Sequence, residues 1–276
     1  MNSNLVTRLL TGLIAIPLLL WLLFGGPAWG WMAFVSVACP VGSLELFGMT
    51  HPGDRVSQAL GVLLSVGVIQ VLWFFGSDVR YVLAAFLLLP LLGLFFTLAR
   101  LGDIETSARR ALAMAFGPAY VGGGLASVIL LRRDAGDVDN AGAGFVTLVL
   151  ILSWASDTGA YFAGRFLGKH KLFPAVSPKK TVEGALGGLA GAALGATVAC
   201  STFLPSLPLV HGLLLAVIAG GLGQAGDLGE SMIKRSYGVK DSGGIVPGHG
   251  GILDRVDATL VVGVLTYLYV LFVRGV

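Results

Sequence analysis

The sequence predicts an all-α integral membrane protein, a polytopic bundle of about nine transmembrane helices with a cytoplasmic N-terminus. Composition supports this fold class, because hydrophobic residues make up 55% of the 276-residue chain and charged residues only 12%. A soluble domain of this length would carry about 25% charged residues. The third observation is a series of apolar segments of about 20 residues, the length at which a helix crosses ~30 Å of hydrocarbon.

Nine segments are long and apolar enough to be transmembrane helices. Only Gly25, Gly26 and Pro27 separate the first two, which predicts a tight helical hairpin. Arg8 precedes the first apolar segment, as in a signal peptide, but no small-residue cleavage site follows it, so we expect it to remain a helix. The predicted spans cover residues 9–25, 28–47, 58–76, 80–98, 111–131, 143–163, 183–204, 208–226 and 256–274.

The distribution of positive charge predicts the orientation of these spans. When the nine spans alternate across the membrane, 14 of the 18 Lys and Arg residues fall on one side. Because Lys and Arg are enriched in cytoplasmic loops, this asymmetry predicts a cytoplasmic N-terminus and an external C-terminus. The two long polar loops, 164–182 and 227–255, are then cytoplasmic. The external loop 132–142 has no evident role, and we expect it to be structural.

We expect one transmembrane domain over residues 1–276, with N-terminal helices in 1–131 and a half that carries both long loops in 143–276. No soluble domain, linker or internal repeat is evident in the sequence. Glycines such as Gly184 and Gly188 recur through the seventh span, and this spacing lets helix backbones approach closely in lipid. Such packing fits helices of one subunit and helices of two copies in a homodimer equally well.

The first polar loop and the helix before it carry groups suited to phosphate binding. Asp157 lies within the sixth predicted span, where an ionisable group is costly and usually faces a cavity, although a buried hydrogen bond between helices is the alternative. The run Ser177-Pro-Lys-Lys-Thr181 leads into the seventh span, where Pro178 is tolerated in a first helical turn and Glu183 favours a helix N-terminus. Paired lysines beside such a terminus predict a phosphate site, but they are also ordinary on a cytoplasmic face.

The second polar loop holds more carboxylates, cations and glycines than a connecting loop needs. Asp227 ends the eighth span, and Asp254 and Asp257 begin the ninth, on one helical face. Mg²⁺ is usually held by one or two carboxylates plus substrate phosphates, so Asp227 and Asp254 at the mouths of two helices predict such a site. Alternatively, Asp254 and Asp257 only stabilise the helix dipole. A loop histidine such as His249 fits a structural role as well as a catalytic one.

Both segments resemble those of a known family. The signature of phosphatidate cytidylyltransferases, also called CDP-diacylglycerol synthases, is similar to the run Ser231-x-Ile-Lys-Arg-x4-Lys240-Asp241-x-Gly243-x3-Pro247-x-His249-Gly250-Gly251-x-x-Asp254-Arg255-x-Asp257. Val246 stands where the family commonly has Leu, Ile or Phe, a change of similar volume. The first segment, from Asp157-Thr-Gly-Ala-Tyr161 to Glu183-Gly184, matches the same family, so the resemblance covers roughly the C-terminal half.

The resemblance implies the reaction of CTP with phosphatidate to give CDP-diacylglycerol and diphosphate. This is a Mg²⁺-dependent nucleotidyl transfer at the cytoplasmic face of the cell membrane, with a catalytic C-terminal half. CTP and phosphatidate in the bilayer are the expected partners, with no nucleic acid. The expected cofactor is Mg²⁺, with room for a second cation. Such transfers depend on positioning and electrostatic stabilisation.

The resemblance also implies roles for individual residues. The implied metal ligands are Asp227 and Asp254, with Asp257 and Asp157 as helpers. The implied substrate-binding residues are Ser177, Lys179, Lys180, Thr181, Gly248, Gly250 and Gly251. The catalytic set adds the charged or titratable residues Lys234, Arg235, Lys240, Asp241, His249 and Arg255.

Two other functions fit part of the sequence. A CTP-dependent kinase of polyprenol or another lipid alcohol would transfer the γ-phosphoryl group, with His249 or an aspartate as its base. An ion-coupled secondary transporter would also show many spans and intramembrane carboxylates such as Glu45, Asp157 and Asp227. It would not require Lys- and Gly-rich loops at one membrane face. The long signature favours the cytidylyltransferase, and it leaves Glu45, in the second span, without an assigned role.

Overall fold

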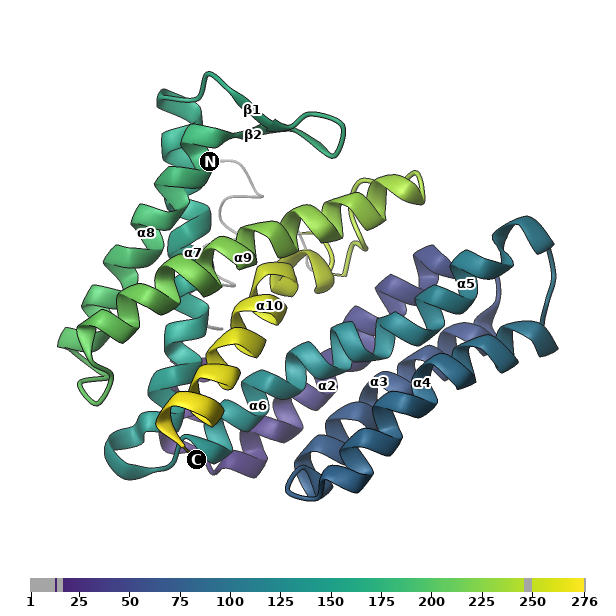
Figure 1. The fold of residues 1–276 in the computed structure, drawn as a ribbon, viewed down its shortest axis with the longest axis horizontal. Coiled ribbons are helices and arrows are strands. Elements are labelled where there is room, and N and C mark those ends of the chain that lie inside the picture. The colour runs from purple at the N-terminus through teal and green to yellow at the C-terminus, as the bar shows by residue number, and fades with distance from the viewer. Residues whose placement is uncertain (1–12, 14–16, 246–249, 276) are drawn as a thin grey trace. The chain divides into compact units, whose positions relative to one another are not determined.

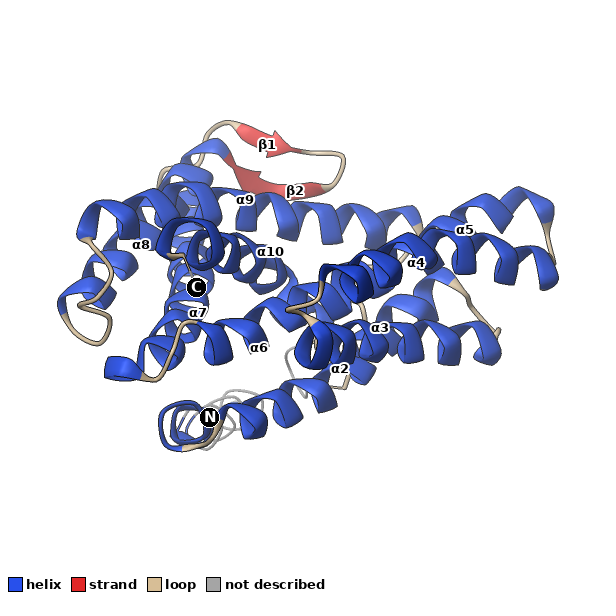
Figure 2. Ribbon diagram, turned by 60° about the horizontal axis from the view of Figure 1, so that its bottom comes forward, coloured by secondary structure: helices blue, strands red, loops and turns tan. Residues whose placement is uncertain are grey.

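The computed structural model describes residue 13, residues 17–245 and residues 250–275. These residues form helices joined by short connections, with one two-stranded hairpin (Figures 1 and 2). The chain divides into two compact units, the first containing residues up to Ile129 and the segment Asp241–Arg255. The second contains Leu130–Lys240 and the residues from Val256 onwards. The signature segment therefore divides between the two units, with 241–255 in the first.

Eight helices among the described residues are long and apolar enough to cross a membrane. Each overlaps one of the predicted spans from the second to the ninth, which confirms an all-α polytopic membrane protein. The first predicted span, 9–25, lies largely outside the described residues, although residues 17–25 are helical and end just before Gly26 and Pro27. The hydrophobic pattern alone was sufficient to locate these helices, because each must present about 20 apolar residues to lipid.

The first unit is built from successive helices. They are α2 (Ala28–Thr50), α3 (Arg55–Phe75), α4 (Val79–Ala99), α5 (Ile104–Gly117), the π-helical turn η1 (Pro118–Gly123) and the beginning of α6 (Gly124–Asp134). The last three elements belong to one continuous helix over Ile104–Asp134. Phe47 is fully buried between α2, α3 and α5, where a Cβ atom at Gly61 would lie 2.4 Å from its ring and one at Gly117 2.7 Å away. Glycine at both positions therefore makes room for the aromatic ring.

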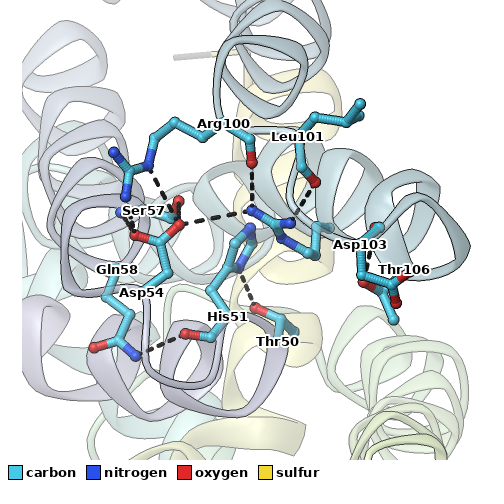
Figure 3. A network of polar contacts seen from close by, with 10 residues as sticks. Thr50, His51, Asp54, Ser57, Gln58, Arg100, Leu101, Asp103 and Thr106 are labelled. Atoms are coloured by element: carbon cyan, nitrogen blue, oxygen red, sulfur yellow. Dashed lines mark hydrogen bonds and ion pairs between the residues drawn. The ribbon is translucent and has the colours of Figure 1, made fainter.

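The turns that end α2 and α4 are joined by a polar network (Figure 3). Asp54 caps α3 by accepting from the Ser57 backbone N–H at 3.2 Å, and it accepts from Arg100 Nη2 at 2.9 Å. Arg110 Nη2 lies 3.6 Å from the same carboxylate and donates to the Arg100 carbonyl at 3.0 Å. His51, 2% exposed, pairs through Nδ1 with the Thr50 hydroxyl at 2.9 Å. One carboxylate thus ties two helix–helix connections together.

This network shifts the titration of its two central groups. Burial and the Arg110 guanidinium lower the pKa of His51 to about 4, although Asp54 acts in the opposite direction. Hydrogen bonds from Ser57 and Arg100 hold the pKa of the Asp54 carboxyl well below its usual range. His51 is therefore neutral and Asp54 ionised at neutral pH.

The second unit consists of the rest of α6, the 3₁₀ turn η2 (Val138–Asn140), α7 (Ala141–Phe166), the hairpin β1 (Lys171–Phe173) and β2 (Ser177–Thr181), α8 (Val182–Ser201), α9 (Leu209–Ser236) and most of α10 (Leu253–Tyr269), which ends in the π-helical turn η3 (Val270–Arg274). The strands are antiparallel, with Lys171 opposite Thr181 and Phe173 opposite Ser177. Helix α8 packs along α7 and α9 (Figure 1).

Close packing of α8 against α7 confirms that the glycines of the seventh predicted span allow backbones to approach. A Cβ atom at Gly191 would lie 2.3 Å from the Ala155 carbonyl oxygen, and one at Gly187 2.2 Å from the Ala163 Cβ. This contact lies within one chain, and the homodimer stays a prediction.

The start of α8 and the end of α9 differ from the predicted positions, so two predictions were wrong. Pro178 lies in strand β2 rather than in a first helical turn, because α8 begins only at Val182, with Thr181 as its N-cap. A two-stranded hairpin has two edges, where the missing N–H of proline is tolerated. Helix α9 continues to Ser236, ten residues beyond the predicted span, so Asp227, Lys234 and Arg235 are helical rather than part of a loop. The basic residues in its last turn favour this extension, because they interact well with the helix dipole.

The connection between α6 and α7 is held by polar contacts that support the structural role expected for 132–142. Arg132 pairs with Asp137 at 2.8 Å, and Arg133 with Asp134 at 2.5 Å. The Tyr267 hydroxyl donates to Asp134 at 2.8 Å, which fastens this connection to α10.

Candidate active site

A cavity of about 540 Å³ lies in the second unit between α7, β2, α8 and α9. Sites for small molecules and cofactors typically have volumes of about 300–1,000 Å³. Five of its lining residues were predicted to bind metal or substrate: Asp157 on α7, Lys179, Lys180 and Thr181 on β2, and Asp227 on α9. The fold therefore joins residues from both predicted polar segments in one cavity.

The central contact in this cavity is an ion pair between β2 and α9. Lys180 Nζ lies 2.6 Å from Asp227 Oδ2, and the two side chains are 29% and 28% exposed. An ammonium group is a natural partner for phosphate, and a carboxylate is a natural ligand for Mg²⁺. The pair therefore places a cation that can bind phosphate and a carboxylate that can bind Mg²⁺ within contact distance of each other.

The hairpin that carries Lys180 is fixed to the start of α8. Thr181 Oγ1 accepts from the Gly184 backbone N–H at 3.1 Å, so this side chain caps the helix. Glu183 accepts from the backbone N–H groups of Lys169 at 3.0 Å and His170 at 3.2 Å, and its Oε1 lies 2.6 Å from His170 Nδ1. Both sets of contacts lie at the Thr181 end of β2, and they fix this end of the hairpin to α8. Ser177 lies at the far end of β2 and is absent from the described cavity lining.

Carboxylates gather on the α9 side of the second unit. Asp227, Glu230 and Asp157 lie close enough to Asp257 on α10 for their charges to interact with it. Within the described part of the chain, no three His, Cys, Asp or Glu side chains converge closely enough to hold a metal ion by themselves. Mg²⁺ usually keeps several waters and takes only one or two carboxylates plus substrate phosphates, so a site for it does not require three such side chains.

A buried ion pair on α9 joins Lys234, a predicted site residue, to Glu230, which was not predicted. The Lys234 ammonium contacts the Glu230 carboxylate one turn earlier, with side chains 9% and 1% exposed. The signal was the spacing of four residues between an acid and a base on one helix. Arg235 is exposed and donates to the Val239 carbonyl at 2.8 Å, which closes the end of the helix. Lys240 is exposed.

Arg165 and Gln224 also line the cavity, and neither was predicted as a site residue. Arg165 lies about two helical turns after Asp157 on α7, and Gln224 lies three residues before Asp227 on α9. Gln224 Nε2 donates to the Ala185 carbonyl of α8 at 3.1 Å. Helical spacing from a predicted site residue would have indicated both.

Asp254, the other principal metal candidate, belongs to the first unit. Its carboxylate accepts from the Ser242 backbone N–H at 3.0 Å and from the Gly251 N–H at 2.9 Å. Gly250 has a φ of +79°, a left-handed conformation that glycine adopts at little cost. Arg255 and Asp241 are exposed, whereas Gly248 and His249 lie outside the described residues.

The model of the cytidylyltransferase family matches residues 6–273. The chain belongs to the cytidylyltransferase family. It is therefore a nucleotidyltransferase, and the match extends the family resemblance from the C-terminal half to the N-terminal helices.

Individual relatives agree with this assignment. A phosphatidate cytidylyltransferase of Bacillus subtilis (strain 168) is 34% identical over 281 residues, covering 96% of each chain. One from Brucella suis biovar 1 is 34% identical over 270 residues, covering 97% of this chain and 93% of the relative. One from Staphylococcus haemolyticus is 42% identical over 153 residues, about half of each chain.

Proposed function

We propose that this nucleotidyltransferase is a phosphatidate cytidylyltransferase, which converts CTP and phosphatidate to CDP-diacylglycerol and diphosphate. The observation that carries the proposal is the Lys180–Asp227 pair in a cavity large enough for a nucleotide. The names of relatives that are 34% identical over nearly the whole chain support the choice of substrates. We also propose that the reaction takes place at the cytoplasmic face, which the excess of Lys and Arg in the loops on one side supports.

The described residues fit a magnesium ion. Carboxylate oxygens are the ligands that Mg²⁺ prefers, and the cavity contains Asp157 and Asp227 beside cationic groups that suit phosphate. On the family signature we propose Asp227 and Asp254 as its principal protein ligands, helped by Asp157 and Asp257, and the number of carboxylates leaves room for a second cation. A bound Mg²⁺ would supply neutralisation of phosphate charge.

The side chains of this chain have a positioning task. A phosphate oxygen of phosphatidate attacks the α-phosphorus of CTP, a new P–O bond forms, and the bond to the β-phosphate oxygen breaks to release diphosphate. The attacking oxygen is already anionic near neutral pH, so no strong general base is needed. Cations must instead hold two anionic reactants together and neutralise the charge on the leaving diphosphate.

We assign this task to two groups of residues. Ser177, Lys179, Lys180 and Thr181 hold the triphosphate together with Arg165, and all of these except Ser177 line the cavity. The remaining members of the catalytic and substrate-binding sets are proposed on the signature: Lys234, Arg235, Lys240, Asp241, Gly248, His249, Gly250, Gly251 and Arg255. Lys234 acts from within its ion pair with Glu230.

Product analysis tests the proposal directly. The purified protein in detergent–lipid micelles is given Mg²⁺, phosphatidate and CTP labelled on its α-phosphate. Transfer of label to the lipid fraction, with release of diphosphate and dependence on phosphatidate, is the expected result. Label that stays in water as CDP while an added polyprenol is phosphorylated would contradict it and support the lipid-alcohol kinase.

A further inference from the structure

Glu45 is a carboxylate inside a helix that is long and apolar enough to cross the membrane. It lies on α2 and is 6% exposed. Burial of an ionisable group in such a helix is costly unless partners compensate for the lost water. The Glu45 carboxylate therefore needs hydrogen-bond partners inside the protein. It lies in the N-terminal helices, far along the chain from the signature segment.

The partners of Glu45 come from that segment, about 200 residues later and in the same unit. Oε1 accepts from the Ile252 backbone N–H at 3.0 Å, and Oε2 accepts from the Leu253 N–H at 2.8 Å. The Ser242 hydroxyl also donates to Oε2, at 3.1 Å. Three donors of the signature segment thus converge on one carboxylate.

Two of these donors belong to the start of α10, which begins at Leu253. The first N–H groups of a helix have no partner within it, and the N-terminus favours negative charge. Glu45 therefore acts as an N-cap supplied by a different helix, because it satisfies two such donors and places a negative charge at the positive end of α10.

The same short segment holds Asp254. The Ser242 backbone N–H donates to the Asp254 carboxylate at 3.0 Å, while the Ser242 side chain donates to Glu45. The Gly251 N–H also donates to Asp254, at 2.9 Å, and the next two N–H groups donate to Glu45. Ser242 and the backbone over 251–253 therefore each contact both carboxylates, which couples the position of Asp254 to that of Glu45.

Two glycines of the signature allow this close approach. A Cβ atom at Gly243 would lie 2.4 Å from Glu45 Oε1, and one at Gly251 would lie 2.5 Å from Oε2 and 2.2 Å from the Ser242 hydroxyl. Neither position accommodates a side chain while Glu45 stays where it is. These glycines thus serve the packing of the segment around a buried carboxylate.

We propose that Glu45 is a positioning residue for nucleotidyl transfer, which holds Ser242 and the first turn of α10 so that Asp254 is presented to metal and substrate. The proposal rests on the proposed role of Asp254. It gives the N-terminal helices a part in the chemistry, because α2 supplies the residue that organises the segment.

The test compares four variants of the full-length protein in detergent–lipid micelles. Glu45→Gln removes the charge with little change of shape, and Ser242→Ala removes one donor while keeping the backbone N–H that binds Asp254. Asp254→Asn provides the reference for loss of the proposed ligand. Ser43→Ala, fully buried on the same helix and 3.7 Å from Cys39 Sγ, is the matched control.

Three quantities are measured for each variant: kcat with the KM for CTP, affinity for Mn²⁺ by electron paramagnetic resonance, and the thermal midpoint of unfolding. We expect Glu45→Gln to lower both kcat and Mn²⁺ affinity about 10- to 100-fold, as changes beside metal ligands commonly do. The KM for CTP should change by less than about threefold, and Ser242→Ala should give a smaller loss of the same kind. Ser43→Ala should match the wild type.

The results distinguish an error in the role of Glu45 from an error in the assignment of Asp254 as a metal ligand. Wild-type kcat and Mn²⁺ affinity in Glu45→Gln and Ser242→Ala, beside an inactive Asp254→Asn, would overturn the role of Glu45 alone. Wild-type turnover in Asp254→Asn would overturn the assignment of Asp254 and, with it, the positioning role. If Glu45→Gln does not fold, wild-type values in Ser242→Ala still overturn the proposal, and a parallel loss of kcat and Mn²⁺ affinity supports it.

Discussion

Lys180 on β2 and Asp227 on α9 form an ion pair in which Nζ lies 2.6 Å from Oδ2. The pair joins the two polar segments of the sequence, which are separated by the whole of α8. Each member is partly exposed to a cavity that also contains Lys179, Arg165 and Asp157. We interpret it as the centre of the nucleotide site, because a triphosphate and its metal would find complementary charges there.

Asp227→Asn should lower turnover by about 100-fold or more, because it removes a carboxylate charge where the metal is proposed to bind. It should also raise the Mg²⁺ concentration that gives half-maximal rate about tenfold or more. The measurement is the initial rate of label transfer across a Mg²⁺ titration, beginning from protein treated with EDTA. Asp139→Asn, an exposed residue of the α6–α7 connection, should behave as wild type. A rate that EDTA leaves unchanged would refute the metal assignment.

Glu230→Gln and Lys234→Met should each destabilise the protein by about 3–5 kcal/mol, because each leaves one buried charge without its partner. The double variant should be less destabilised than the sum of the two single changes, since no unpaired charge remains. Unfolding free energies in micelles complete this double-mutant cycle, with Arg235→Ala at the exposed neighbouring position as the control. Strict additivity of the two changes would show that the pair is not formed.

Gly191→Ala should destabilise the packing of α8 on α7 by about 1–3 kcal/mol or more, because the new methyl group would lie 2.3 Å from the Ala155 carbonyl oxygen. Gly67→Ala on α3 is the matched control, because a Cβ atom there meets no atom within 4 Å. It should be neutral or stabilising by up to about 1 kcal/mol, since alanine favours helix. Thermal unfolding of both variants measures the difference. Equal effects would argue against direct backbone contact between α7 and α8.

The network around His51 predicts a dependence of stability on pH. Burial and Arg110 lower the pKa of His51 to about 4 in the folded protein, whereas histidine in the unfolded chain has its ordinary pKa of 6.5. As pH falls below 6.5, the unfolded chain therefore binds a proton at His51 before the folded protein does. Stability should therefore fall between pH 6.5 and 4, by up to roughly 3 kcal/mol. Asp54, whose pKa is held low, loses its contribution only at more acidic pH.

Substitution at His51 isolates this contribution. His51→Gln should flatten the decrease in unfolding free energy between pH 7.5 and 5. Gln58→Ala, which removes a 2.9 Å hydrogen bond to the His51 carbonyl but no titrating group, should keep the wild-type slope. Identical slopes for wild type and His51→Gln would contradict the assignment.

The helices were predictable because each follows from a local property, a run of about 20 apolar residues. The limits of that reasoning appear where the ends of helices depend on tertiary contacts. Polar residues such as Asp227 and Glu230 end an apolar run, but the structure continues α9 to Ser236. Hydropathy describes only the membrane-embedded part of a helix.

The sequence indicated several of the residues that line the cavity, but not the contacts between them. Charge and spacing indicated Lys180 and Asp227, yet nothing in one sequence indicates that they touch. Glu45 shows the same limit more clearly, because its partner Leu253 lies 208 residues away. One sequence contains no signal for a contact of that separation, and a carboxylate in an apolar run showed only that some compensation was needed.

Equilibrium binding of CTP in the presence of Mg²⁺ tests the central claim, that the cavity beside the Lys180–Asp227 pair is the nucleotide site. The comparison uses wild type, Lys180→Ala and Lys171→Ala, where Lys171 is an exposed residue of β1 that lies outside the cavity lining. Loss of a charged hydrogen bond typically costs about 1.5–3 kcal/mol, so Lys180→Ala should weaken CTP binding about tenfold or more. Lys171→Ala should stay within about twofold of wild type. Wild-type affinity in Lys180→Ala would contradict the account and require the nucleotide to bind elsewhere.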